Sequence, residues 1–339
     1  MWPIIRNINL LRYLIIWRVN SSIVWQPGYL PLDLSLTLGT TIGNRLPTSE
    51  ARQWHKLLAP WAEQATTLSR RARRRKKTKG ERQEVKFMPD AGWPIESVLF
   101  PYRHQTNYGK GELLLWELKL FGDSADHAFF LEVILPAMEE ISLSASLPWH
   151  HPYGLWGHFD IQAVYVAHGE EWEPVIEDGR LDLSVRPTST QWSDGLNFNP
   201  DTMGRLNRLI WLTPATFYKS DRFRRKPFPP SLQTILQALL TRLGDVLPEK
   251  RYSPEEIAAQ LTPEGGETFE QLLERADAIP VQRHTFKRVP KTWPRGRQGE
   301  QTFASIPQPF IPYLNLASIL HIGRHTHFGY GTFVAGYSI

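Results

Sequence analysis

The stretch His321-Ile322-Gly323-Arg324-His325-Thr326-His327-Phe328-Gly329-Tyr330-Gly331 places three glycines among four cationic or titratable side chains. Glycine lets a backbone approach a ligand closely and adopt a positive φ, so that its N–H groups can point at an anion. The apolar spacing of Pro309–Leu320 predicts a helix before this turn, and the alternation in Tyr330–Tyr337 predicts a strand after it. Helix, basic glycine-rich turn and terminal strand together predict a platform for a phosphate backbone.

Working back along the chain, the order of elements predicts a repeated plan. The first half contains expected strands at Leu10–Val19, Glu96–Arg103, Leu113–Phe121 and Gly157–Ala167, with helices near Glu50–Ser69 and Ala125–Leu143. Strand–helix–strand–strand–helix–strand is the ferredoxin-like order. The second half repeats it, with strands near Leu206–Leu212, Ile279–Val289 and Gln301–Ile306, helices at Ser231–Leu243 and Pro309–Leu320, and a final strand. The predicted fold class is α+β, with tandem ferredoxin-like (RRM-like) domains.

The expected domain boundaries follow from this order. Residues 1–185 form the N-terminal ferredoxin-like domain, with a basic loop near 70–79. Residues 186–204 connect it to the C-terminal ferredoxin-like domain, 205–339, which ends in the glycine-rich loop. The acidic, polar and turn-rich stretch 170–204 is interpreted as the connection between the halves. The polar segment Glu255–Ala276 is interpreted as an insertion in the second half.

Composition narrows the class of protein. The chain has 339 residues, a formal net charge of +5 and a pI of about 9.3, which favours a polyanionic partner. It contains no cysteine, which excludes disulfides, thiolate metal sites and a cysteine nucleophile and fits a cytoplasmic protein. The apolar N-terminal stretch is interrupted by arginines, and its longest clean run, Tyr13–Trp17, is far below the ~18 residues of a membrane span. Neither a signal peptide nor a membrane anchor is expected.

Two basic segments are candidate RNA contacts. Eight of the ten residues in Arg70–Lys79 are cationic, a pattern that fits a solvated or disordered loop and equally an arm that neutralises phosphates. The loop Arg283–Arg297 has no acidic residue and interleaves Phe286 and Trp293 with the cations Arg283, Lys287, Arg288, Lys291, Arg295 and Arg297. Guanidinium groups bind phosphates, and aromatic rings stack on unpaired bases. The composition of this loop therefore favours contact with RNA over the alternative, a solvated two-stranded ribbon whose charges serve solubility alone.

The glycine spacing resembles that of a known family. Gly323 is followed after five residues by Gly329 and after one more by Gly331, as in the C-terminal glycine-rich loop of the CRISPR-associated endoribonucleases that cut repeat RNA (Cas family six, RAMP superfamily). This chain has His321 where the family pattern has a further glycine. Three more segments resemble the family in the same order: Leu113–Gly122, Gly154–Phe159 and Leu209–Thr216.

The resemblance implies a function. Enzymes of this family need no metal: the ribose 2′-OH attacks the adjacent phosphate and leaves a 2′,3′-cyclic phosphate and a 5′-OH. The implied activity is cleavage of CRISPR precursor RNA within its repeat to give mature guide RNAs. The alternative is a non-catalytic RNA-binding RAMP subunit of an interference complex, with other subunits of that complex as partners. No cofactor is expected.

The chemistry requires a general base, a general acid and cations that stabilise developing charge. Related enzymes often carry the histidine on or beside the first helix of the N-terminal domain, where this chain has His55 with Lys56 beside it. A partly exposed histidine without a catalytic role is an equal alternative, and His104 and His158 are the next candidates. His150 and His151, in a loop rich in proline and tryptophan, could also approach RNA.

The glycine-rich turn itself is predicted to bind RNA. Its contacts are expected from Gly323, Arg324, His325, His327, Gly329 and Gly331. His321, His325 and His327 could suggest a metal, because imidazole is a common neutral ligand. No acidic residue lies near them in the sequence, so a metal site is not expected here.

Overall fold

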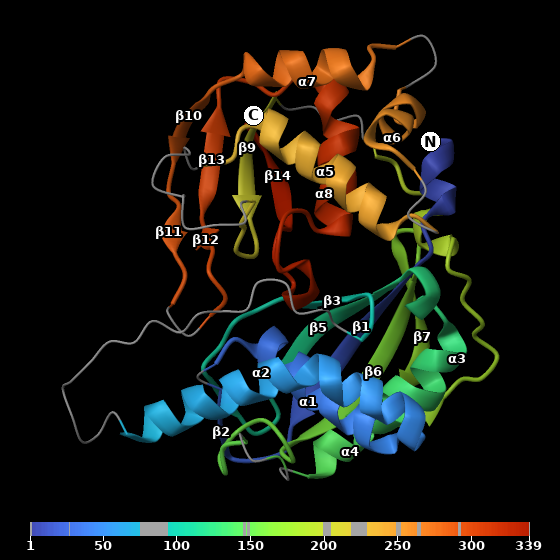
Figure 1. Ribbon diagram of the computed structural model, residues 1–339, viewed down its shortest axis with the longest axis vertical. Coiled ribbons are helices and arrows are strands. Elements are labelled where there is room, and N and C mark those ends of the chain that lie inside the picture. The colour runs from blue at the N-terminus through green and yellow to red at the C-terminus, as the bar shows by residue number, and fades with distance from the viewer. Residues whose placement is uncertain are drawn as a thin grey trace.

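A computed structural model describes residues 2–26, 28–74, 94–144, 147, 150–198, 205–217, 229–248, 252–262, 266–290 and 293–338. It contains two antiparallel sheets, each with helices against one face, and one domain lies above the other (Figure 1). Both domains have the ferredoxin-like arrangement, and the predicted α+β fold class with tandem ferredoxin-like domains is confirmed.

The first sheet has the strand order β3-β5-β1-β6-β7-β8. Its strands are β1 (Leu10–Val19), β3 (Ser97–Pro101), β5 (Leu113–Phe121), β6 (Phe159–His168), β7 (Glu171–Glu177) and β8 (Arg180–Leu181). The helices α1 (Leu30–Arg45), α2 (Thr48–Arg74), α3 (His127–Phe129) and α4 (Leu135–Leu143) belong to this domain. Alternate residues of β1, from Leu11 to Trp17, are buried in the core that the helices share with the sheet. The period of two is what a strand with one face on a core requires.

The second sheet has the order β10-β13-β9-β14, which repeats that of the first four strands of the first sheet. Its strands are β9 (Arg205–Trp211), β10 (Val281–His284), β13 (Glu300–Phe303) and β14 (Phe333–Ser338). The helices α5 (Leu232–Val246) and α8 (Ile311–Leu320) pack against it, and α6 (Pro254–Gln260) and α7 (Phe269–Asp277) form the expected insertion. Two short ribbons complete the fold: β2 (Ile23–Trp25) with β4 (Asn107–Gly109), and β11 (Lys287–Arg288) with β12 (Arg297–Gln298).

Two expectations about local structure are wrong. The first helix was expected near Glu50–Ser69, but the 16-residue helix α1 precedes it. The stretch 170–204 begins with β7 and β8, which extend the first sheet before the connection starts. The basic segment Arg70–Lys79 lies largely outside the described residues. The structure describes the backbone of α2 up to Arg74 but no side chain of this helix after Ala62.

A small apolar cluster joins the two domains. Tyr29, Leu32 and Leu36, at the start of α1, pack against Phe328 and Tyr330 of the second domain. On its other side the same helix buries Leu30, Leu34, Leu38 and Ile42 in the first core. Helix α1 therefore lies between two apolar surfaces, and the glycine-rich turn packs against it at the domain junction.

Candidate functional site

The glycine-rich turn is packed against protein backbone on several sides. Gly329 has a φ of +76°, and a Cβ at this position would lie 2.3 Å from the carbonyl oxygen of Leu99 in β3. Gly331 has a φ of +88°, and its Cβ would lie 1.9 Å from the carbonyl oxygen of Ile322. Only glycine fits such positions, because a side chain would overlap the neighbouring backbone and is disfavoured at positive φ.

Several backbone N–H groups of this turn donate hydrogen bonds to carbonyl oxygens of the protein itself. The N–H of Gly329 donates to Thr326 O at 2.8 Å, and the N–H of Gly331 donates to Pro214 O at 2.9 Å. Arg324 donates its N–H to Thr216 O at 2.8 Å, and a Cβ on Gly323 would meet the same oxygen at 2.6 Å. Arg324 and His325 remain partly exposed. In this conformation the turn offers side chains to a phosphate more readily than the N–H groups of Gly329 and Gly331.

His327 joins the turn to the first domain. Its Nδ1 lies 3.0 Å from Ser97 O in β3, and its Nε2 lies 2.9 Å from Ser35 Oγ in α1. A carbonyl oxygen only accepts, so Nδ1 carries the proton and Nε2 accepts from the Ser35 hydroxyl. Burial lowers the pKa of His327 to about 3, which keeps the imidazole neutral at neutral pH. The prediction that His327 contacts RNA is untested, but its ring nitrogens have protein partners.

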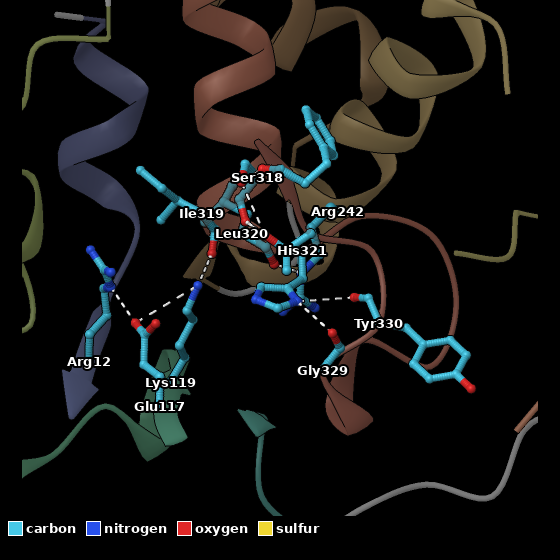
Figure 2. Close-up of polar contacts among 12 residues, drawn as sticks. Arg12, Glu117, Lys119, Arg242, Ser318, Ile319, Leu320, His321, Gly329 and Tyr330 are labelled. Atoms are coloured by element: carbon cyan, nitrogen blue, oxygen red, sulfur yellow. Dashed lines mark hydrogen bonds and ion pairs between the residues drawn. The ribbon is translucent and has the colours of Figure 1, made fainter. Parts of the chain in front are cut away.

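The C-terminus of α8, just before the turn, receives cations from two sides (Figure 2). Lys119 Nζ of β5 donates to Ile319 O at 2.6 Å, and Arg242 Nε of α5 donates to Leu320 O at 3.0 Å. Carbonyls at a helix C-terminus lack partners within the helix and carry partial negative charge, so these contacts are favourable. Burial lowers the pKa of Lys119 to about 7, although Glu117 lies 3.9 Å away.

His321 is completely buried, and its ring points toward Gly329 and Tyr330 of the turn (Figure 2). Its Nδ1 donates to Gly329 O at 3.2 Å and to Tyr330 O at 3.1 Å. Burial, with nearby Lys119, holds the pKa of His321 well below its usual range. His321, at the end of α8, therefore links the start of the turn to Gly329 and Tyr330 at its end.

An aromatic cluster lies where the turn, the basic loop and the first domain meet. The ring of His104 lies 5.2 Å from that of Tyr29 and 4.9 Å from that of Trp293, and Tyr29 and Trp293 are 4.5 Å apart. The Tyr29 hydroxyl donates to Phe328 O at 2.8 Å. His104 is nevertheless solvent-exposed, and the packing of these rings lowers its pKa. The junction thus holds a neutral imidazole at the surface.

The basic loop lies beside this cluster and is exposed along much of its length. The cations Arg283, Lys287, Arg288 and Arg295 are exposed, and Arg297 is half-buried. Lys291 lies outside the described residues. Phe286 is 93% buried and packs near Trp211, so its expected stacking on RNA bases does not fit this conformation. Trp293 is half-buried in the aromatic cluster.

The other predicted catalytic residues lie elsewhere on the first domain. His55 and Lys56 are exposed on α2, and the His55 ring approaches Gly43 of α1. His158 precedes β6, with its Nε2 3.3 Å from Pro152 O, at the end of β1 remote from Leu10. Of the candidate histidines, His104 is the one with a ring contact to the basic loop. Sequence reasoning missed Tyr29, Ser35 and Ser97, which no local motif distinguishes.

The fold thus consists of two ferredoxin-like domains with a glycine-rich turn at their junction. Residues 209–333 match the family model of the CRISPR-associated endoribonuclease Cas6, and the resemblance predicted from the sequence is confirmed. The match covers the second domain from β9 to the start of β14, and thus includes the basic loop and the turn.

Solved structures share the fold. A partial Cas6-RT-Cas1–Cas2 complex matches with a TM-score of 0.52 and 11% identity, covering 98% of this chain and 46% of that one. A Cas6-RT-Cas1–Cas2 complex matches with the same score and identity over 98% of this chain and 29% of that one. The chain thus spans less than half the length of these two. A Cas6 product complex matches with a TM-score of 0.45 and 16% identity, covering 96% of this chain and 100% of that one.

No curated protein matches the chain. In the part of the chain that the structure describes, no helix combines the length and apolar character needed to cross a membrane. Among the same described residues, no group of three or more histidine, aspartate or glutamate side chains is arranged to hold a metal ion.

Proposed function

We propose that this protein is an endoribonuclease that cleaves CRISPR precursor RNA within its repeat, by attack of a ribose 2′-OH that leaves a 2′,3′-cyclic phosphate. The observation that carries the proposal is the match of residues 209–333 to the Cas6 family over the part of the chain that forms the junction. There the exposed His104 packs against Trp293 of the basic loop, which also carries exposed arginines. These are the groups that transesterification of RNA requires.

His104 is the general base that the geometry favours. Its ring is neutral at neutral pH, so it can accept the proton of a 2′-OH without first losing one. A phosphate bound between His104 and the basic loop would favour the protonated ring and raise its pKa toward neutrality. That shift brings the group closer to the range in which acid–base catalysis works best. The exposed Arg295 and half-buried Arg297 are proposed to stabilise the charge that develops on the phosphate.

His55 and Lys56 remain candidates by position in the family, and His158 by chemistry. Both His55 and His104 keep a solvent-exposed surface, so RNA could reach either ring. The contact of His104 with Trp293 of the basic loop supports it over the other two. The second candidate function, a non-catalytic RNA-binding subunit, shares the fold and the same basic surface.

Cleavage in the presence of EDTA separates these functions. The purified protein is incubated with its repeat RNA, and the products are analysed for 2′,3′-cyclic phosphate and 5′-hydroxyl ends. We expect cleavage at one position in the repeat, with these ends and without added metal. RNA that is bound tightly but stays intact would support the binding subunit and contradict the enzyme.

A further inference from the structure

The ribbon β2–β4 presents an apolar face to solvent. Along β2, Val24 is fully buried, whereas Ile23 is 67% exposed and Trp25 is 42% exposed. On β4, Asn107 is paired with Trp25 and Gly109 with Ile23, and both lie on the same outer face. A Cβ on Gly109 would meet nothing within 4 Å. An outward tryptophan beside an outward isoleucine is unusual, because exposed positions of a strand are normally polar.

Two more rings extend this face. His151 lies 5.0 Å from Trp25 in an edge-to-face arrangement, and Tyr153, 69% exposed, lies 5.8 Å from His151. We call Ile23, Trp25, His151 and Tyr153 the aromatic patch. The patch belongs to the first domain and lies outside the glycine-rich turn and the basic loop; of its members, His151 was named from the sequence as a residue that could approach RNA.

The backbone that carries the aromatic patch is held by hydrogen bonds. Trp25 N donates to Tyr153 O at 2.7 Å, and Tyr153 N donates to His151 Nδ1 at 3.1 Å. His150, which precedes His151, is buried and stacks on Trp156. Its Nε2 lies 3.0 Å from Thr37 Oγ1 of α1. Because the loop is anchored in the domain, its rings lose little conformational freedom when a ligand binds.

The ribbon leads from this patch to the aromatic cluster at the junction. Gln26 N donates to Thr106 O at 2.8 Å, which continues the pairing of β2 with β4 toward Tyr29 and His104. His104 and Asn107 are three positions apart in the chain. Trp25 and Tyr29 are four positions apart, so each path is at most about 10–14 Å long. A few unpaired nucleotides span that distance. Exposed cations flank the ribbon at Arg103 and Lys110.

We propose that the aromatic patch is a stacking site for unpaired bases of an RNA that enters or leaves the junction. The inference deepens the proposed function, on which it rests for the class of ligand. Flat rings presented one by one suit bases, because every base has a π face and stacking tolerates any sequence. Four side chains are too few for a stable protein interface, which buries about 800 Å² on each partner. The net charge of +5 also favours a polyanion.

The test uses the full chain and two fluorescein-labelled oligomers of equal length: oligouridine, which cannot pair, and the corresponding abasic ribose-phosphate. Fluorescence anisotropy measures the affinity for each. Wild type should prefer oligouridine. Trp25→Ala and Tyr153→Ala should each lose about 10-fold in affinity for oligouridine and little for the abasic oligomer, because stacking alone is removed.

Two controls make the result specific. Trp25→Phe keeps a ring and should retain most of the affinity for oligouridine, and Leu143→Ala, at an 84% exposed position on α4, should bind as wild type does. Equal loss on both oligomers, or no loss at all, would overturn the proposal. Unchanged RNA affinity with an altered oligomeric state, measured by light scattering, would overturn it in favour of a protein contact. The binding assay needs no cleavage, so its outcome is independent of whether the protein is an enzyme.

Discussion

Gly329→Ala is predicted to weaken the contact between the two domains. Gly329 has a φ of +76°, and the left-handed conformation costs a residue with a Cβ roughly 1–2 kcal/mol. The new Cβ would also lie 2.3 Å from Leu99 O, far inside normal contact. Relief of this overlap requires the turn to move away from β3. That movement strains the hydrogen bonds of His327 with Ser97 and of Tyr29 with Phe328 O, which contribute about 1 kcal/mol each. The total loss is therefore roughly 3–4 kcal/mol.

The matched control is Gly179→Ala, in the turn between β7 and β8. Gly179 has a φ of +72°, but a Cβ there would meet nothing within 4 Å. This variant should lose only the conformational cost of roughly 1–2 kcal/mol. The free energy of unfolding is measured by urea denaturation for both variants. Equal losses would contradict this prediction, because they would show that the contact with Leu99 contributes nothing. Wild-type RNA binding by a destabilised Gly329→Ala would show that this glycine has a structural role alone.

Three further predictions concern charges and titrating groups. His327 has a folded pKa of about 3, below its unfolded value, so the unfolded state binds more protons between these values and stability falls as pH drops below about 6.5. Urea denaturation of His327→Ala should show less of this acid sensitivity, and an unchanged pH dependence would contradict it. Lys119 has a folded pKa of about 7, so stability should rise between pH 7 and 10 by at most about 1.4 kcal/mol per pH unit, and Lys119→Met should remove that rise. Replacing the exposed Arg283, Arg288 and Arg295 by alanine should flatten the dependence of log K on log salt by about 0.7 for each phosphate that the protein no longer neutralises, and a slope equal to that of wild type would place these residues in solvent.

The order of the main strands and helices was predictable because strands such as β1 and β5 are runs of apolar residues and helices such as α2 and α5 have an apolar stripe. Helix α1 was not. Its sequence, LPLDLSLTLGTTIGNR, places leucines at every second position from Leu30 to Leu38, which obscures a helical period. The helix is buried on two sides, by the first core and by Phe328 and Tyr330. A helix between two apolar surfaces has no continuous polar face, so the usual signal is absent.

The sequence predicts which residues the candidate site contains, but it does not predict which of these residues contact each other. The glycine spacing and the cations of the basic loop are local features of the sequence. The partners of His327, Ser35 and Ser97, lie 292 and 230 positions away, and no local motif relates them. The same holds for His104 and Trp293, which meet only because the two domains are packed together. The burial of Phe286 likewise depends on Trp211 from another strand.

The most direct measurement is the single-turnover rate of repeat-RNA cleavage in EDTA by wild type, His104→Ala, His55→Ala and His158→Ala. A positioned general base contributes roughly 10²–10⁴ in rate. We expect His104→Ala to lose cleavage by that order with nearly unchanged RNA affinity, while His158→Ala retains it. We also expect the wild-type rate to rise with pH through a histidine-like step. A full rate in His104→Ala, with the loss appearing in His55→Ala instead, would contradict the assignment of the cleavage site to the domain junction.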